Sequence, residues 1–180
     1  LFMRSVQAYR QAGRGLYIRE GIADIGVKEI RQAVREHIRL LGRKPLVVVD
    51  YLQILQPADP RATDKQNTDR AVVELKRISR DFDIPVFAVS SFNRENYRNA
   101  VSMEAFKESG AVEYSSDVLL GLQLEGAGDP GFDVNAAKAA SPRQVELVML
   151  KNRSGMPYAK IGYRYHAKYS YFSEGTRIKR

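Results

Sequence analysis

Residues 46–50 read Leu-Val-Val-Val-Asp, and residues 86–91 read Val-Phe-Ala-Val-Ser-Ser. Each stretch is a short apolar run without polar alternation, which is typical of strands covered on both faces in a parallel sheet. Between the two runs, residues 72–82 carry apolar side chains at spacings of three and four, which predicts an amphipathic helix. Two buried strands joined by a helix predict a right-handed βαβ crossover.

The flanking sequence extends this pattern in both directions. Residues 27–41 repeat the helical spacing among charged residues, and Gly42 follows as a C-cap. Residues 126–142 are rich in Gly, Ala and Pro and are expected to form a loop. Further strands are expected at residues 118–122, 145–150 and 159–165. The predicted fold class is α/β, with a parallel sheet early in the chain and an antiparallel hairpin late.

Composition narrows the possible functions. The 180 residues contain 29 Lys and Arg against 21 Asp and Glu, a formal net charge of +8 at pH 7. This balance favours a phosphate-rich partner, because Lys and Arg displace the counterions of nucleic acids. The absence of cysteine excludes disulfide scaffolds, thiolate catalysis and Cys-ligated zinc. No histidine metal site is expected, since His37 and His166 each lack a second ligand nearby in the sequence.

Polar residues directly after the two predicted strands are candidates for chemistry, because open α/β sheets bind ligands beyond the carboxyl ends of their strands. Asp50 could hold a Mg²⁺-bound water beside a nucleotide's phosphates, or it could cap a helix or form a loop salt bridge. Ser90 and Ser91 could sense a γ-phosphate, or they could form a turn that satisfies loop backbone. These alternatives stay open at this point.

Three further clusters combine charge with a special local pattern. Residues 107–110, Lys-Glu-Ser-Gly, offer a cation and a glycine that permits close approach, or they form a solvated helix start. Lys151 and Arg153 flank one residue of an extended segment, so their side chains point the same way. They could reach a phosphate chain across an interface or lie in a solvated turn. The Tyr-rich, basic residues 158–180 either stack on single-stranded nucleic acid or form an edge hairpin.

In this order, four stretches resemble the C-terminal ATPase domain of DnaB-like replicative helicases, which has a RecA-like fold. They are KPLVVVDYLQIL (44–55), LKRISRDFDIPVFAVSSFNR (75–94), FKESGAVEYSSDVLLGLQ (106–123) and KNRSG (151–155), and the likeness extends over residues 15–172. The resemblance implies a mostly parallel sheet flanked by helices, with a C-terminal antiparallel hairpin. It also implies ATP and Mg²⁺ at subunit interfaces, a hexameric ring around single-stranded DNA, and a role in DNA replication. A primase or helicase loader as partner, and the cytoplasm of a bacterium or of a phage-infected host, are implied as well.

The resemblance assigns roles to residues at the predicted nucleotide site. Asp50 matches the Walker-B Asp that positions Mg²⁺ through water. Ser91 stands where many members have a Gln that relays the nucleotide state, so the chain departs from the family there. Lys151 and Arg153 match the pair that reaches into the neighbouring subunit's nucleotide site. We expect Asp50, Ser91 and the two cations to converge at one rim, which a second subunit completes.

The resemblance also assigns residues to DNA binding. Lys107, Glu108 and Gly110 match a loop that contacts the DNA backbone inside the ring. Lys107 replaces the usual Arg, which keeps the charge and loses the bidentate fork. Arg61 and Lys65, in an expected loop over residues 57–67, match the other segment that faces the channel.

A phosphate-binding GxxxxGK[ST] loop does not occur in the 180 residues. We therefore expect residues 1–180 to be a single partial RecA-like domain that lacks the N-terminal part of its core and hydrolyses little or no ATP alone. The missing strands would leave a sheet edge exposed, through which copies of the chain would associate. Two other functions stay open: an ATPase-dead module that binds single-stranded DNA or docks on a helicase, and another RecA-like ATPase.

Overall fold

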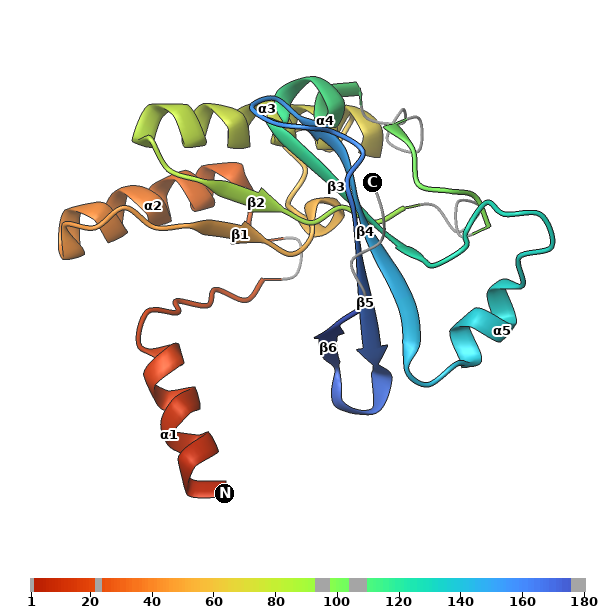
Figure 1. Ribbon diagram of the computed structural model, residues 1–180. Coiled ribbons are helices and arrows are strands. Elements are labelled where there is room, and N and C mark those ends of the chain that lie inside the picture. Colours follow the sequence, from red (N-terminus) through yellow and green to blue (C-terminus); the bar gives the residue numbers. More distant parts are fainter. Residues whose placement is uncertain (1, 22–23, 93–97, 104–109, 176–180) are drawn as a thin grey trace.

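A computed structural model describes residues 2–21, 24–92, 98–103 and 110–175 of the chain (Figure 1). The elements are α1 (Phe2–Gly13), α2 (Val27–Leu41), β1 (Val47–Val49), the 3-10 turn η1 (Leu52–Ile54), α3 (Asp64–Phe82), β2 (Val86–Ala88), α4 (Gly110–Ser115), β3 (Val118–Leu124), α5 (Val134–Ala139), β4 (Arg143–Asn152), β5 (Lys160–His166), the 3-10 turn η4 (Ala167–Tyr169) and β6 (Tyr171–Glu174). None of the helices among the described residues is long and apolar enough to cross a membrane.

The strands form two sheets of opposite character. β1 and β2 pair in parallel, with Val47 opposite Val86 and Val49 opposite Ala88, and α3 connects them. This confirms the predicted βαβ unit. The second sheet is antiparallel and has the order β3-β4-β5-β6. The expected late hairpin is therefore part of a larger sheet in which β4 is the longest strand.

Local capping signals set the helix boundaries. α2 ends at Leu41, and Gly42 is its C-cap, as predicted. Gly42 has a positive φ of 63°, and its N–H bonds to the Ile38 carbonyl. The expected loop over residues 57–67 is too long, because a capping box between Thr63 and Gln66 starts α3 at Asp64. Lys65 therefore lies in the first turn of a helix.

The predicted loop over residues 126–142 also needs correction, because it contains the short helix α5. Asp133 caps this helix by accepting hydrogen bonds from the backbone N–H groups of Asn135 and Ala136. The segment was predicted as a loop from its Gly, Ala and Pro content, and the capping residue Asp133 was not considered.

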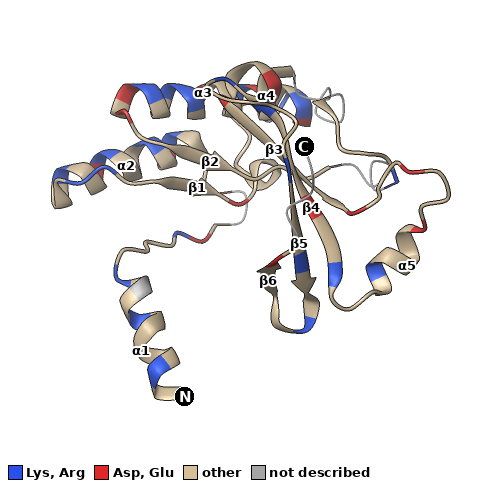
Figure 2. Cartoon of the chain, in the orientation of Figure 1, with Lys and Arg blue, Asp and Glu red and all other residues tan. Residues whose placement is uncertain are grey.

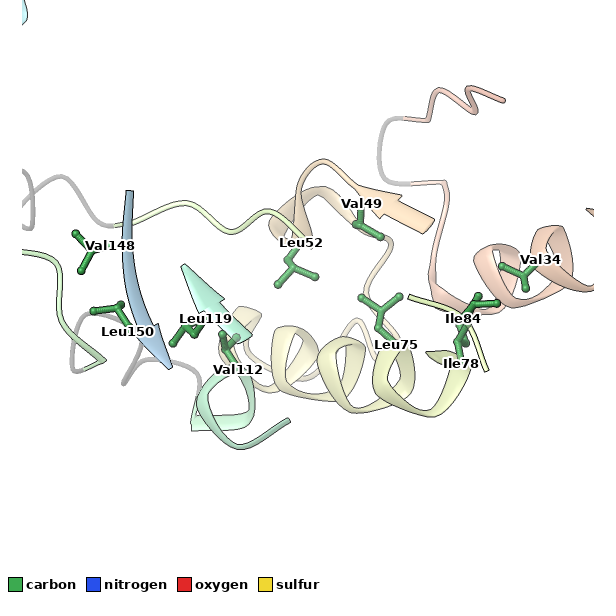
Figure 3. Close-up of a cluster of buried hydrophobic side chains, with 10 residues drawn as sticks. All are labelled: Val34, Val49, Leu52, Leu75, Ile78, Ile84, Val112, Leu119, Val148 and Leu150. Atoms are coloured by element: carbon green, nitrogen blue, oxygen red, sulfur yellow. The ribbon is translucent and has the colours of Figure 1, made fainter. Parts of the chain in front are cut away.

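One hydrophobic core joins the two sheets (Figure 3). Ile78 of α3 is fully buried, and Leu75 is 3% exposed. On one side these residues are continuous with Val34 of α2 and Val49 of β1, and on the other with Val112, Leu119, Val148 and Leu150. α3 also packs against α4, η1, α2 and β2. The helix thus fixes the parallel strands relative to the antiparallel sheet.

The expectation that β1 and β2 are covered on both faces is wrong for the described residues. Val48 is 59% exposed and Phe87 is 52% exposed, whereas Val49 is buried. α1 stands apart from the rest of the molecule at the end of an extended segment (Figure 1). That segment touches α2 through a Tyr17–His37 edge contact and an Arg19–Glu36 ion pair. One apolar face of the parallel pair is therefore open in the described structure.

Candidate functional site

Asp50 lies at the carboxyl end of β1, between two buried anchors. Val49 is 7% exposed and Leu52 is 4% exposed, whereas Asp50 is exposed. The chain leaves β1 through Asp50 and enters η1, and the N–H of Leu52 bonds to the Val89 carbonyl at 2.9 Å. Among the described residues, no hydrogen bond or ion pair engages the Asp50 carboxylate. The fold therefore fixes its backbone and leaves its oxygens available to a ligand.

Gln53 ties the carboxyl ends of the two parallel strands together. Its amide nitrogen donates to the Ser90 hydroxyl at 2.9 Å, and its amide oxygen accepts from the Ser91 N–H at 3.4 Å. Asp50, Ser90 and Ser91 thus share one end of the sheet, as the strand-end pattern predicts. Gln53 was not predicted as a site residue, although it belongs to the stretch 44–55 that carries the family resemblance.

The loop before α3 is organised around Asp59. Its carboxylate accepts from the Arg61 backbone N–H at 3.0 Å and pairs with Arg70 at 3.3 Å. The Arg61 N–H, followed by Arg70, lowers the pKa of Asp59 below its ordinary value. The Arg61 and Lys65 side chains are exposed, and no described residue forms a side-chain hydrogen bond or ion pair with either. Both cations are therefore available to a polyanion.

Gly110 begins α4, whereas Lys107 and Glu108 lie outside the described residues. A Cβ added at Gly110 would meet no described atom within 4 Å. Packing among the described residues therefore does not explain the glycine at this position.

Lys151 and Arg153 are both bound to the segment formed by α4 and the residues after it. The Lys151 ammonium donates to the Glu113 carbonyl at 2.6 Å. The Arg153 guanidinium pairs with the Asp117 carboxylate at 2.8 Å, and the Arg153 backbone N–H donates to the Asp117 carbonyl, also at 2.8 Å. Glu113 and Asp117 belong to the stretch 106–123 that carries the family resemblance. Their contacts with Lys151 and Arg153 were not predicted, because these partners are more than 30 positions away.

Asp117 is surrounded by positive charge. Lys76 of α3 forms a further ion pair with its carboxylate. The hydrogen bond from Lys76 lowers the pKa of Asp117 below its ordinary value, and the charges of Lys76, Arg153 and Lys151 act in the same direction. The Arg153 side chain remains 57% exposed, so the ion pair does not cover it.

Arg153 does not lie at the same end of the parallel sheet as Asp50. Arg153 lines an open cavity of about 590 Å³ together with Lys76, Arg80, Ile84 and Pro85. Ile84 and Pro85 directly precede β2, whereas Ser90 follows it. Five residues of extended chain span about 16 Å.

Within one chain, Arg153 therefore lies apart from Asp50 and Ser91, and the expected convergence at a rim that a second subunit completes stays a prediction. The pairing of Asn152 with Val118 explains the separation. It sets the end of β4 beside the start of β3 and therefore beside α4.

The Tyr-rich C-terminal stretch forms the antiparallel hairpin β5–β6, with β6 at the sheet edge. Tyr165 packs against Phe172 at 4.6 Å between ring centroids, and the Arg143 guanidinium lies over the Tyr165 ring. The edge-hairpin interpretation of these residues is confirmed. Tyr169, at the tip, remains 71% exposed.

Glu146 of β4 is a buried carboxylate that the sequence analysis missed. It is 6% exposed, accepts from Gln123 at 2.9 Å and pairs with Lys160 at 3.2 Å. Gln123 also accepts from the Val101 N–H at 2.6 Å. These partners satisfy the buried charge and attach residue 101 to the antiparallel sheet.

Comparison with known proteins identifies relatives that match most of the chain. The family described as the DnaB-like helicase C terminal domain matches residues 3–174. A probable replicative DNA helicase of Trieres chinensis is 28% identical over 154 residues, which are 83% of this chain and 32% of that protein. The replicative DNA helicase DnaC of Bacillus subtilis is 25% identical over 163 residues, which cover 88% of this chain and 34% of that protein. The chain thus spans about a third of the length of these relatives.

Two solved structures share the fold. One is a DnaB-like replicative helicase described with its interactions with primase, with a TM-score of 0.69 and 24% identity over 82% of this chain and 35% of that one. The other is described as an ATPase domain, with a TM-score of 0.69 and 24% identity over 84% of this chain and 52% of that one. The expected RecA-like fold is thereby confirmed.

Proposed function

Because the chain belongs to the DnaB-like helicase C-terminal domain family, we propose that residues 1–180 are one partial RecA-like ATPase domain of an ATP-dependent replicative DNA helicase. The protein would form a hexameric ring, hydrolyse ATP between subunits and translocate on single-stranded DNA during DNA replication. A cytoplasmic location belongs to that proposed role, and a primase or a helicase loader is the partner class that we propose.

Asp50 is the proposed Walker-B residue. Mg²⁺ in nucleotide sites is held by one or two carboxylates and by the phosphates, and it retains several waters. The described residues contain no group of three or more His, Cys, Asp or Glu side chains that could hold a metal. A single exposed carboxylate at a strand end fits the water-mediated arrangement. When bound, Mg²⁺ neutralises charge on the phosphates.

Ser91 is the proposed nucleotide-sensing residue beside Asp50. Its backbone N–H is held by Gln53, which also holds Ser90. A movement of Ser91 would therefore move Gln53 in η1, and with it Asp50, which follows β1. In this chain the link through Gln53 would take the place of the Gln side chain that many family members have where Ser91 stands.

The observation that carries the proposal is the separation of Asp50 from Arg153. Ser90 and Ile84 mark opposite ends of β2, and Arg153 lies with Ile84. A nucleotide that contacts both Asp50 and Arg153 would then lie between two copies of the chain. Lys151 and Arg153 would then stabilise the charge that develops on the phosphates of a neighbouring subunit.

Single-stranded DNA is the proposed polymer substrate. Arg61 and Lys65 are exposed cations whose side chains have no described partner, and Gly110 leaves room for close approach at the start of α4. Lys107 and Glu108, shortly before Gly110, complete the proposed contact with the DNA backbone. Basic residues are spread over α1, α2 and α3 as well (Figure 2), and the net charge of +8 favours binding of a polyanion.

The test uses the full-length protein that contains this chain. We expect it to hydrolyse ATP faster with single-stranded DNA present and to separate a forked duplex. Asp50→Asn should abolish both activities and leave binding of single-stranded DNA intact. Hydrolysis and strand separation unchanged by Asp50→Asn would contradict the assigned role. DNA binding by a full-length protein without any hydrolysis would favour the ATPase-dead binding module instead.

A further inference from the structure

Asp117 is placed where cations from two distant segments meet. One carboxylate oxygen accepts from Arg153 at 2.8 Å, and the other pairs with Lys76 of α3. The Asp117 backbone carbonyl also accepts the Arg153 N–H. Arg153 is therefore held both at its backbone and at its guanidinium by one residue.

We infer that Asp117 is a positioning residue that fixes the Arg153 guanidinium in the orientation in which it reaches a neighbouring subunit's phosphates, with Lys76 orienting the Asp117 carboxylate. The inference rests on the proposed function, because it gives Arg153 its role. It assigns to Asp117 no contact with the nucleotide.

An exposed arginine samples many rotamers, and a mobile cation contributes little to a transition state that requires exact placement. The Asp117 contact restricts this freedom at the far end of the side chain. It involves one nitrogen, Nη1, of a group that has five N–H donors in a planar fork. The remaining donors stay available, in agreement with the 57% exposure of the side chain.

Lys76 makes the carboxylate itself rigid. It binds Oδ2, whereas Arg153 binds Oδ1, so each oxygen of the carboxylate is held by a different cation. Lys76 lies on α3, one position after the buried Leu75, and is therefore attached to the core. Asp117 thus connects Arg153, in the turn after β4, to Lys76 of α3.

Lys151 is held by the same segment, through the Glu113 carbonyl near the end of α4. A carbonyl in the last turn of a helix has no partner within the helix, and a cation is favoured there. Both proposed cations therefore depend on residues 113–117 for their position.

The experiment is a double-mutant cycle of DNA-stimulated ATP hydrolysis in the full-length protein, with Asp117→Asn, Arg153→Ala and the double variant. We expect Asp117→Asn to lower kcat by roughly ten- to a hundredfold, the size of effect that a misplaced catalytic group produces, with KM unchanged. In the Arg153→Ala background the same substitution should cause no further loss. A merely structural role would lower activity in both backgrounds.

Asp81→Asn is the matched control, because Asp81 of α3 forms an exposed ion pair with Arg31 of α2 at 2.7 Å. It should leave kcat unchanged. If Asp117→Asn does not assemble, Lys76→Met provides the second cycle with Arg153→Ala, with a smaller loss of kcat expected.

The outcomes separate the inference from the proposed function. Full activity of Arg153→Ala would overturn the role of Arg153 and the inference with it. An inactive Arg153→Ala combined with a fully active Asp117→Asn would overturn the inference alone. So would losses that add in the double variant.

Discussion

The parallel unit β1–α3–β2 and the antiparallel sheet β3–β6 differ in how the carboxylates on and beside their strands are held. In the parallel unit, the Asp50 carboxylate has no partner among the described residues, and Val48 and Phe87 are exposed. In the antiparallel region, Glu146 is buried with two partners, and Asp117 is held by two cations. The parallel unit therefore presents a carboxylate that is available to a ligand. The antiparallel region holds its carboxylates with partners of the same chain and leaves the Arg153 side chain exposed.

The largest expected effect comes from removing the outward cation. Arg153→Ala in the full-length protein should lower kcat for ATP hydrolysis by about 10³-fold or more, the range found for arginines that act across an interface. Steady-state phosphate release measures the loss. Arg77→Ala is the control, because Arg77 is 55% exposed and ion-paired with Glu74, as Arg153 is 57% exposed and paired with Asp117. Equal losses in both variants would contradict a specific role for Arg153.

The second prediction compares how much the covered face and the open face of the parallel unit contribute to the free energy of unfolding. Ile78→Ala should lower the free energy of unfolding by about 2–5 kcal/mol, because Ile78 is fully buried in the core. Phe87→Ala should change it by less than about 0.5 kcal/mol, since half of that side chain is already exposed. Urea unfolding of the 180-residue chain measures both values. A large loss for Phe87→Ala would show that a partner covers this face in solution.

The third prediction concerns the cations without described side-chain partners in and before α3. Arg61→Ala and Lys65→Ala should each weaken binding of single-stranded DNA to a similar extent on unrelated sequences. Each should also reduce the slope of log affinity against log salt by about 0.7, the value for one phosphate contact on a single strand. Fluorescence anisotropy across a salt series measures both effects. Lys44→Ala serves as control, because Lys44 is paired with Asp83. An unchanged slope in the Arg61 and Lys65 variants would remove them from the DNA contact.

The smallest expected effect is a pH dependence of stability in the antiparallel region. The folded-state pKa of Asp117 lies below its ordinary value of 3.8, chiefly because of Lys76. The ion pair therefore contributes fully above pH 3.8, and its contribution is lost as the pH falls through the lowered folded pKa. The difference in urea midpoint between the chain and Asp117→Asn should be constant from pH 5 to pH 7 and should shrink below pH 3.8. A difference that increases on acidification would contradict this sign.

The parallel unit was predictable because its signals are local. The apolar runs at residues 46–49 and 86–89 and the helical spacing between them fix two strands and a crossover, and strand ends meet at one edge of a parallel sheet. The start of α3 and the helix α5 depend on single capping residues, Thr63 and Asp133. They were not predicted, because the composition of the surrounding residues is typical of loops.

The position of the cations could not be obtained from spacing. The two-residue alternation of side chains along a strand indicates that Lys151 and Arg153 point the same way. It does not tell near which end of the parallel sheet the strand β4 finishes. The register of Asn152 with Val118 decides this, and it is a long-range property. The contacts of Gln53, Glu113 and Asp117 were not predicted for the same reason, since their partners are distant in the sequence.

The most direct measurement mixes two inactive full-length variants, Asp50→Asn and Arg153→Ala, and follows ATP hydrolysis. If Asp50 of one subunit and Arg153 of its neighbour form one site, mixed rings contain interfaces in which both residues are intact, and hydrolysis returns to a fraction of the original rate. If the two residues act within one subunit, no mixture restores an intact site, and the mixed rings stay inactive.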